Sequence, residues 1–198
     1  MALGVVLVLL SSWAVQAQTA EWHSVVSDEV YFIAQFPSRP TLTEGDISGG
    51  FGKGYSRRWT LETTDVFYEV SVNDFPDLSI EMDYKPLNLF YDQICDDLAS
   101  QYGAKFDYYT DILFDEYGRT AGRRTKEFAV SVRIYLVRQR LYQVKTVRRN
   151  SLGNDKQTSE DIKHFMKQFI FVHRKENEKQ YSLGLPETVS QGLRRRKN

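Results

Sequence analysis

The sequence predicts an α+β fold in which a largely antiparallel β-sheet is flanked by two main helices. Stretches with period-two alternation of apolar residues follow one another along the chain, and two stretches between them have helical three-four spacing. No alternating strand–helix–strand units occur, so a doubly wound parallel sheet is not expected. The chain has 198 residues, 41% of them hydrophobic, which favours a single globular domain.

The first part of the chain is expected to form strands. Val30–Phe36 is a strand-like run that ends at Pro37. Tyr55–Glu62 and Val66–Val72 alternate on either side of a short polar turn, which predicts a hairpin. Thr41–Gly54 is rich in glycine and polar residues, and we expect it to be a loop.

The clearest helical periodicity lies in Pro86–Tyr102. Pro86 suits the first turn of a helix, and Gly103 suits the position where one ends. The residues at three-four spacing, expected to form its apolar face, are Leu87, Phe90, Tyr91, Ile94, Leu98 and Tyr102.

Strands are expected to resume at Phe106–Phe114. They continue through Phe128–Leu136, where every even-numbered residue is apolar, and Leu141–Arg148. A capped helix should then open at Thr158 or Ser159, and Phe169–Val172 should form a short strand or the helix end. The side chains that this helix is expected to bury are Ile162, Phe165, Met166 and Phe169.

Both ends of the chain differ from its middle. Residues 1–17 are typical of a secretory signal peptide, because Ala2–Leu10 is an apolar run too short to span a membrane and Val15 and Ala17 suit a signal peptidase. No Lys or Arg stands near Met1, which leaves an uncleaved anchor as the alternative. We expect a single domain over residues 18–174 and a flexible tail with a basic end over 175–198. The expected destination is the periplasm or the extracellular space.

The formal net charge of zero hides an uneven distribution. Residues 1–118 contain 19 acidic and 6 basic side chains, whereas residues 119–198 contain 7 acidic and 20 basic ones. One interpretation is a basic surface for an anionic partner, such as an acidic protein, a polyanionic glycan or a lipid headgroup, and Arg133 should then lie on an exposed face of its strand. The other interpretation is charge matching between basic and acidic strands of one domain. The candidate binding residues are Arg119, Arg123, Arg124, Arg133, Arg138 and Arg140.

The sequence offers little for catalysis or for cofactors. The three histidines have no partner at metal-ligand spacing, and no Ser nucleophile elbow occurs. The glycine-rich stretch Gly49–Gly54 precedes a strand rather than a helix, so it does not fit a phosphate loop. Cys95, the only cysteine, excludes an intramolecular disulfide and is expected to be a buried, inert thiol. We therefore expect no enzyme activity, no cofactor and no metal, and we do not expect a nucleic-acid partner.

Several short stretches resemble the PsbP-like family, which includes extrinsic photosystem II proteins and small exported bacterial proteins. They cover about Trp22 to Val172. The resemblance implies an antiparallel sheet with flanking helices, and it implies a role as a binding or assembly factor without shared catalytic residues. Two departures are that no obvious turn precedes Phe128 and that Arg138-Gln139 lacks the Gly or Asn of a tight primed turn. The stretches that carry the resemblance are Trp22 with Phe32–Pro37, Tyr117-Gly118-Arg119 through Gly122-Arg123, Arg133–Val137, Arg140–Val144 and Asp161–Phe171.

The leading hypothesis for function is an exported, non-enzymatic binding or accessory protein that recognises its partner through a sheet edge or the basic face. No stable membrane span is expected after signal cleavage. The alternative is a carrier of a small apolar or amphipathic ligand, held between the first helix and the sheet. A hydrolase is the third class considered. The residues expected to line the carrier's pocket are Phe90, Tyr91, Trp59 and Tyr109.

Overall fold

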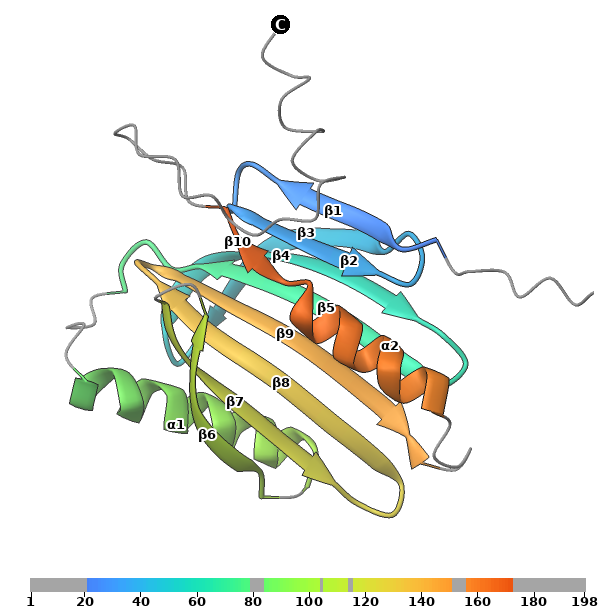
Figure 1. Ribbon diagram of the computed structural model, residues 1–198. Helices are drawn as coiled ribbons and strands as arrows, with labels where there is room; N and C mark the ends of the chain where they lie inside the picture. The colour runs from blue at the N-terminus through green and yellow to red at the C-terminus, as the bar shows by residue number, and fades with distance from the viewer. Residues whose placement is uncertain (1–20, 79–83, 104, 114–115, 151–155, 173–198) are drawn as a thin grey trace, which may run out of the picture.

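Two antiparallel sheets and two helices make up the fold of the computed structural model (Figure 1), which describes residues 21–78, 84–103, 105–113, 116–150 and 156–172. The larger sheet has the strand order β3-β4-β5-β9-β8-β7-β6, and the smaller sheet has the order β1-β2-β10. The α+β prediction, with a mostly antiparallel sheet and two flanking helices, is therefore confirmed. The strands of the larger sheet are β3 (Thr41–Gly49), β4 (Gly52–Glu62), β5 (Val66–Asp74), β6 (Asp107–Leu113), β7 (Glu116–Arg124), β8 (Phe128–Val137) and β9 (Arg140–Arg149).

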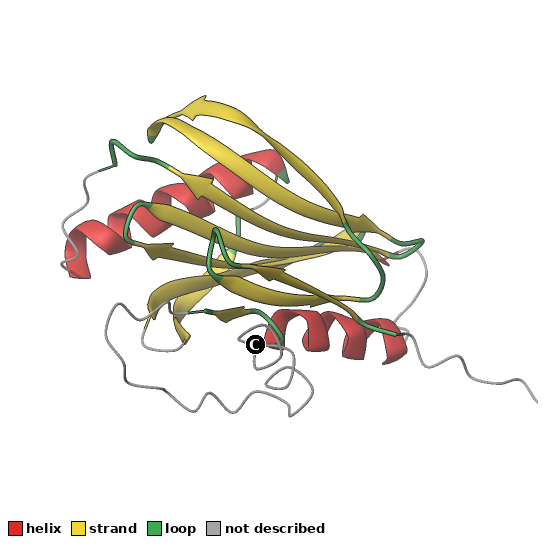
Figure 2. Ribbon diagram, turned by 90° about the horizontal axis from the view of Figure 1, so that it is seen from above, coloured by secondary structure: helices red, strands yellow, loops and turns green. Residues whose placement is uncertain are grey.

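The two helices lie on opposite faces of the larger sheet (Figures 1 and 2). Helix α1 (Tyr84–Gln101) covers the half that contains β7 and β8. Helix α2 (Lys156–Lys167) covers the other face, next to β9 and β2. The smaller sheet, made of β1 (His23–Ser27), β2 (Phe32–Phe36) and β10 (Ile170–Phe171), lies on the same side as α2.

Alternation along β8 supplies the core under α1. Val130, Val132, Ile134 and Leu136 are all buried there, as their spacing predicts. The hydroxyl of Tyr91 accepts a hydrogen bond of 2.8 Å from the backbone N–H of Leu136, which ties α1 to the strand. The helix contributes the predicted apolar face, with Leu87, Phe90, Tyr91, Ile94, Cys95 and Leu98 buried.

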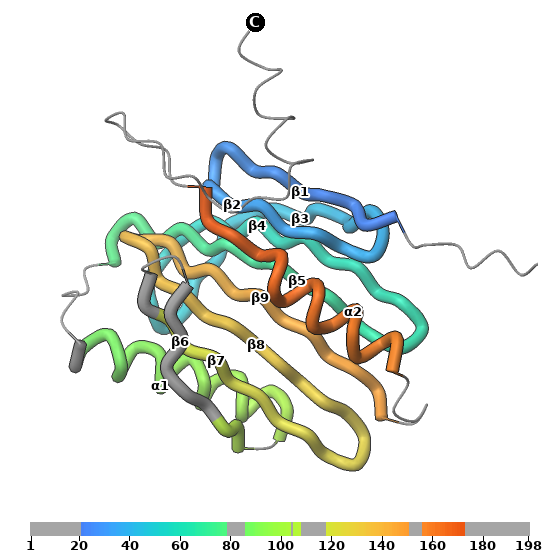
Figure 3. Tube along the Cα trace, viewed as in Figure 1, coloured from blue at the N-terminus to red at the C-terminus, as the bar shows by residue number. Residues whose placement is uncertain are grey.

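A second core, rich in aromatic residues, lies between the two sheets and α2. Phe169 follows α2 and is fully buried, with its ring centroid 5.6 Å from that of Phe32 and 5.2 Å from that of Phe171. Figure 3 follows the chain from α2 into β10, which pairs with β2 and so joins the end of the domain to its beginning. Tyr135 of β8 also reaches this core, because odd-numbered residues of that strand face α2.

The prediction of a loop over Thr41–Gly54 is wrong. These residues form β3, a two-residue turn and the first part of β4, paired in register from Thr41↔Thr60 to Gly49↔Gly52. Most side chains of β3 are exposed, so the strand does not need the apolar alternation that identifies half-buried strands in a sequence. Gly52 has a φ of 98°, a backbone conformation that glycine readily supplies at the turn.

A turn does precede Phe128, contrary to the sequence reading. Residues 125–127 connect β7 to β8, and the Thr125 hydroxyl accepts a hydrogen bond of 3.1 Å from the Phe128 N–H. Thr63 forms the same contact with the Val66 N–H at 3.0 Å in the turn between β4 and β5. A threonine hydroxyl thus closes both turns without glycine or asparagine.

Other element boundaries differ from the predictions by a few residues. Helix α1 spans Tyr84–Gln101 rather than Pro86–Tyr102. Helix α2 begins at Lys156 and not at Thr158 or Ser159. Ser159 lies within the helix, and its hydroxyl accepts a hydrogen bond of 3.1 Å from Arg148. Strands β8 and β9 are joined by a tight turn at Arg138-Gln139, although neither residue is Gly or Asn, and Arg138 has a φ of 60°. The signal peptide predicted at 1–17 and the tail at 175–198 lie outside the described residues.

Replacing Phe169 with alanine should lower the free energy of unfolding by about 3–5 kcal/mol, because it leaves a cavity among four aromatic rings. Chemical denaturation of the full chain measures this loss. Leu89→Ala on the exposed face of α1 is the control, and its effect should stay within about 0.5 kcal/mol. Equal losses for the two variants would show that the aromatic core is not formed as described.

Candidate functional site

The six candidate arginines lie on both faces and at both ends of the larger sheet. Arg119 faces α1, whereas Arg133 faces α2. Arg123 and Arg124 are exposed at the end of β7, and Arg138 and Arg140 lie at the β8–β9 turn. The structure therefore does not gather these six side chains on one surface.

Arg119 is a buried residue of β7 that bonds to helix α1. Its side chain is 8% exposed, and its Nη2 donates hydrogen bonds of 2.8 Å to Asn88 Oδ1 and 2.7 Å to Asp92 Oδ1. Next to it, Gly118 lies under the ring of Tyr135, where an added Cβ would come within 2.3 Å of a ring carbon. Gly118 thus allows Tyr135 to pack closely on one face of β7, and Arg119 bonds β7 to helix α1 on the other face.

Arg133 points away from Val132 and Ile134, as alternation predicts, but that face is not open. Helix α2 covers it, and Arg133 Nη1 donates a hydrogen bond of 2.9 Å to the carbonyl oxygen of Met166 in the last turn of the helix. A guanidinium in this position bonds a carbonyl at the helix end and complements the negative end of the helix dipole. The expectation of an exposed Arg133 is wrong, because the sequence does not show which face the second helix covers.

The two arginines of the β8–β9 turn differ from each other. Arg138 is exposed at the turn itself. Arg140 bonds to Asp74 Oδ1 and donates a second hydrogen bond of 2.9 Å to the carbonyl oxygen of Glu29, while its guanidinium carbon lies 5.2 Å from the ring centre of Tyr31. Burial acts to lower the pKa of Arg140, but the hydrogen bond and the charge of Asp74 outweigh it, so the pKa is raised.

Ion pairs connect the acidic first part of the chain to its basic second part. Lys145 Nζ lies 3.0 Å from Glu69 Oε1, and both side chains are largely buried, at 13% and 5% exposure. At the surface, Arg149 lies 3.4 Å from Glu62 and Arg123 lies 3.8 Å from Asp107. Together with the Arg119–Asp92 and Arg140–Asp74 pairs, these contacts confirm the charge-matching interpretation.

A group of charged residues that the sequence reading missed surrounds Arg57 in β4. The Arg57 guanidinium lies 3.0 Å from Asp74, 3.1 Å from Glu44 and 3.2 Å from Glu29. Arg140 shares Asp74 with it. We call Arg57, Arg140, Glu29, Glu44 and Asp74 the Arg57 cluster. The signal for it is the cross-strand pair Glu44↔Arg57, which becomes visible only once Thr41–Gly49 is recognised as a strand.

Strand β3 forms one edge of the larger sheet. On the side away from β4, no backbone hydrogen bond joins it to any other segment in the described part of the chain. Its nine residues are mostly exposed, and they include Leu42, Glu44 and Asp46. An edge of this kind presents a row of N–H and C=O groups to which another extended chain can pair.

The pocket expected between the first helix and the sheet is not formed by the residues named for it. Phe90 and Tyr91 are in the core under α1, whereas Trp59 is in the core on the α2 side of the sheet. The Tyr109 side chain lies outside the described part. These residues therefore do not line one cavity.

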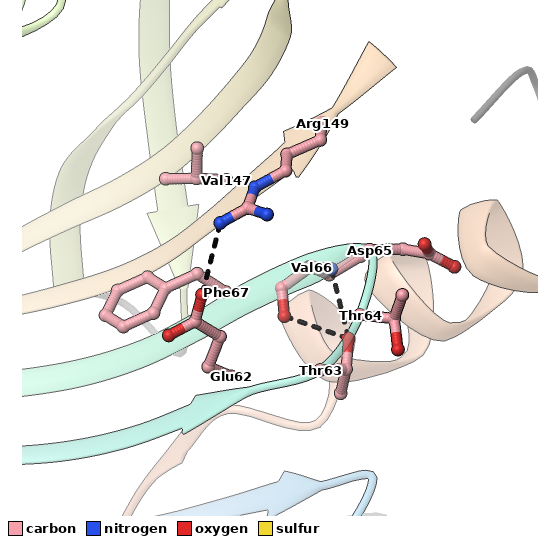
Figure 4. Close-up of a pocket in the computed structure, with 8 residues that line it drawn as sticks. All are labelled: Glu62, Thr63, Thr64, Asp65, Val66, Phe67, Val147 and Arg149. Atoms are coloured by element: carbon pink, nitrogen blue, oxygen red, sulfur yellow. Dashed lines mark hydrogen bonds and ion pairs between the residues drawn. The ribbon is translucent and has the colours of Figure 1, made fainter. Parts of the chain in front are cut away.

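Figure 4 shows a pocket at the β4–β5 turn instead. It is open, has a volume of about 210 Å³, and contains the Glu62–Arg149 ion pair and the Thr63–Val66 hydrogen bonds. Ligand pockets commonly enclose about 300–1,000 Å³ and are mostly apolar. The residues that line it are Glu62, Thr63, Thr64, Asp65, Val66, Phe67, Val147 and Arg149.

The potentially reactive side chains are placed as follows. Cys95 is buried under α1, and burial raises its pKa to about 11, although the charge of Arg119 acts in the opposite direction. His164 Nε2 lies 2.9 Å from Gln35 Oε1, and its ring packs against Trp22. Within the described residues, no three His, Cys, Asp or Glu side chains are grouped so that they could hold a metal ion. No helix among them is long and apolar enough to cross a membrane.

Comparison with known proteins gives no relative. No protein-family model, no curated protein and no solved structure matches the chain.

Replacing Lys145 with methionine should lower the free energy of unfolding by about 3 kcal/mol, because the buried Glu69 carboxylate loses its closest cation. The double variant Glu69→Gln/Lys145→Met should recover much of the loss, since it removes the buried carboxylate, which among the described residues would otherwise keep only the half-exposed Arg58, 3.7 Å away, as its partner. The matched control is Lys163→Met, which breaks a surface pair with Glu160 and should cost less than about 1 kcal/mol. Urea denaturation of the unchanged chain and the three variants measures these free energies of unfolding. Equal losses for Lys145→Met and Lys163→Met would contradict the buried Lys145–Glu69 pair.

Cys95 should react on the order of 100-fold more slowly with a thiol reagent at pH 8 in the folded chain than in the unfolded chain, because burial keeps the thiol protonated and inaccessible. The reaction is followed by absorbance in the presence and absence of denaturant. Rapid labelling of the native protein would mean that this face of α1 does not pack against the sheet.

Proposed function

We propose that this chain is an exported, non-enzymatic binding or accessory protein that recognises a partner protein at the edge strand β3. The observation that carries the proposal is the nine-residue edge whose outer side pairs with no other described segment. Addition of an extended segment to such an edge is a common mode of peptide recognition, in which main-chain hydrogen bonds supply affinity.

The placement of the arginines favours the sheet edge over a basic face. Arg119, Arg133 and Arg140 each bond to groups of the same domain, and they lie on different sides of the sheet. A surface that attracts a polyanion needs several cations directed to one side. A protein partner at the edge requires no such concentration of positive charge.

The N-terminal sequence supports export. The apolar run Ala2–Leu10 and the small residues before position 18 have the pattern of a secretory signal. The resemblance to PsbP-like proteins supports the same destination, since that family includes small exported proteins that act as binding or assembly factors. We extend this resemblance to the chain as part of the proposal.

The proposed function is tested by photo-crosslinking in cells that naturally express the chain. A photoreactive amino acid at Thr43 in β3 should give a crosslinked product in the exported fraction, because a bound segment would lie beside this residue. The same amino acid at Leu89, exposed on α1, is the control and should give none. Crosslinks of equal yield at both positions, or none at Thr43, would reject β3 as the binding edge.

A further inference from the structure

The charges on β3 favour a basic partner. Glu44 and Asp46 are two residues apart and therefore project from the same side of the strand. Glu44 remains 41% exposed although it contacts Arg57. In the Arg57 cluster and Asp46 together, four carboxylates accompany two guanidiniums, and Lys53 of β4, opposite Ser48, adds one cation on the same face. Negative charge is therefore in excess by one around β3.

The same two carboxylates disfavour pairing of β3 with a second copy of itself. In an antiparallel self-pairing centred on Gly45, Glu44 of each chain would lie opposite Asp46 of the other. Shifting the centre by one residue places Glu44 opposite Glu44 or Asp46 opposite Asp46. Like charges directly across a strand pair are destabilising, so each of these central registers is penalised. The occupant of this edge is therefore expected to be a different chain.

Gly45, between the two carboxylates, provides space for a large side chain. It projects from the opposite face of the strand, and a Cβ built there meets no atom within 4 Å. Its φ is not positive, so the turn chemistry that often requires glycine does not apply. Aromatic residues on a neighbouring strand can cover a glycine of an edge strand. Thr43 and Ile47 flank the space on the same face.

We infer that β3 binds an extended protein segment in which an aromatic residue stands between two basic residues. The two basic side chains lie opposite Glu44 and Asp46, and the aromatic ring covers Gly45 on the other face of the strand. The alternation of side chains along a strand imposes this order, because successive residues of the incoming segment point to opposite faces. This inference rests on the proposed function, and it specifies the chemistry of the partner.

The probe is the peptide Thr-Val-Lys-Tyr-Lys-Val-Thr, added to the full chain at low ionic strength. It should slow hydrogen exchange of the outward-pointing β3 amides, which do not bond to β4. It should also bind at least tenfold more tightly than Thr-Val-Glu-Tyr-Glu-Val-Thr, in which two like-charge pairs replace the two opposite-charge pairs. Thr-Val-Lys-Gly-Lys-Val-Thr should bind about threefold to fivefold more weakly than the probe, since it lacks the ring. Added salt should reduce the difference between the lysine and glutamate peptides.

The variant Glu44→Gln/Asp46→Asn tests the residues. It should weaken binding of the probe peptide by about tenfold and remove the preference for the lysine peptide over the glutamate peptide. The matched control is Glu62→Gln/Asp65→Asn, which changes the net charge by the same amount at the β4–β5 turn and should leave binding unchanged. Thermal unfolding verifies that both variants remain folded.

The possible results separate this inference from the proposed function. If peptides of either charge slow exchange of the β3 amides equally, the basic–aromatic–basic inference is overturned and binding at the edge stands. If no peptide affects β3 while Thr43 still gives a crosslinked partner, the inference again fails alone. If both tests are negative, both proposals fail. Protection of the outward-pointing β3 amides, which do not bond to β4, in the chain without peptide also overturns the inference, because the edge is then occupied by the chain itself or by a second copy.

Discussion

The structure depends on one constraint: the central strands of the larger sheet are buried on both faces. Along β8, Val132 and Ile134 pack under α1, while Tyr135 packs in the aromatic core beneath α2. A shift of one residue in the register of such a strand would exchange the side chains of the two cores. Tyr135 would then face the core under α1, and Ile134 and Leu136 would face the aromatic core beneath α2. The two cores together therefore fix the register of the sheet.

Coverage of both faces also determines where the charged residues can lie. Basic side chains on the central strands are enclosed by helices or by neighbouring strands, so each needs an acceptor within the domain. Lys145 meets Glu69, Arg119 meets Asp92, and Arg133 meets the end of α2. At the sheet edge, where most residues of β3 are exposed, the carboxylates of Glu44 and Asp46 remain accessible. Five basic residues of the second part of the chain thus meet carboxylates of the first part within the described residues.

The sequence predicted the parts of the fold in which burial leaves a periodic signal. The even-numbered residues of Phe128–Leu136 and the apolar face of α1 follow directly from their spacing. Strand β3 was missed because its side chains are mostly exposed, and glycine and polar residues there carry no trace of burial. The turn at 125–127 was missed because it contains neither glycine nor asparagine. A hydrogen bond from the Phe128 N–H to the Thr125 hydroxyl closes it instead. The burial of Arg133 depends on which face of the sheet α2 covers, and the Arg57 cluster depends on the register of β3 against β4. The spacing of apolar residues along the sequence predicts neither.

The pairing of β10 with β2 has a consequence for the synthesis of the chain. Phe32 and Phe36 lie near the beginning of the described domain, but the rings that cover them, Phe165 and Phe169, lie near its end. The aromatic core therefore cannot close until nearly the whole domain has left the ribosome, and contacts of such long sequence separation form slowly. If the chain is exported as proposed, this delay favours passage through a translocation channel in an unfolded state. Folding would then be completed on the far side, by the arrival of the final strand.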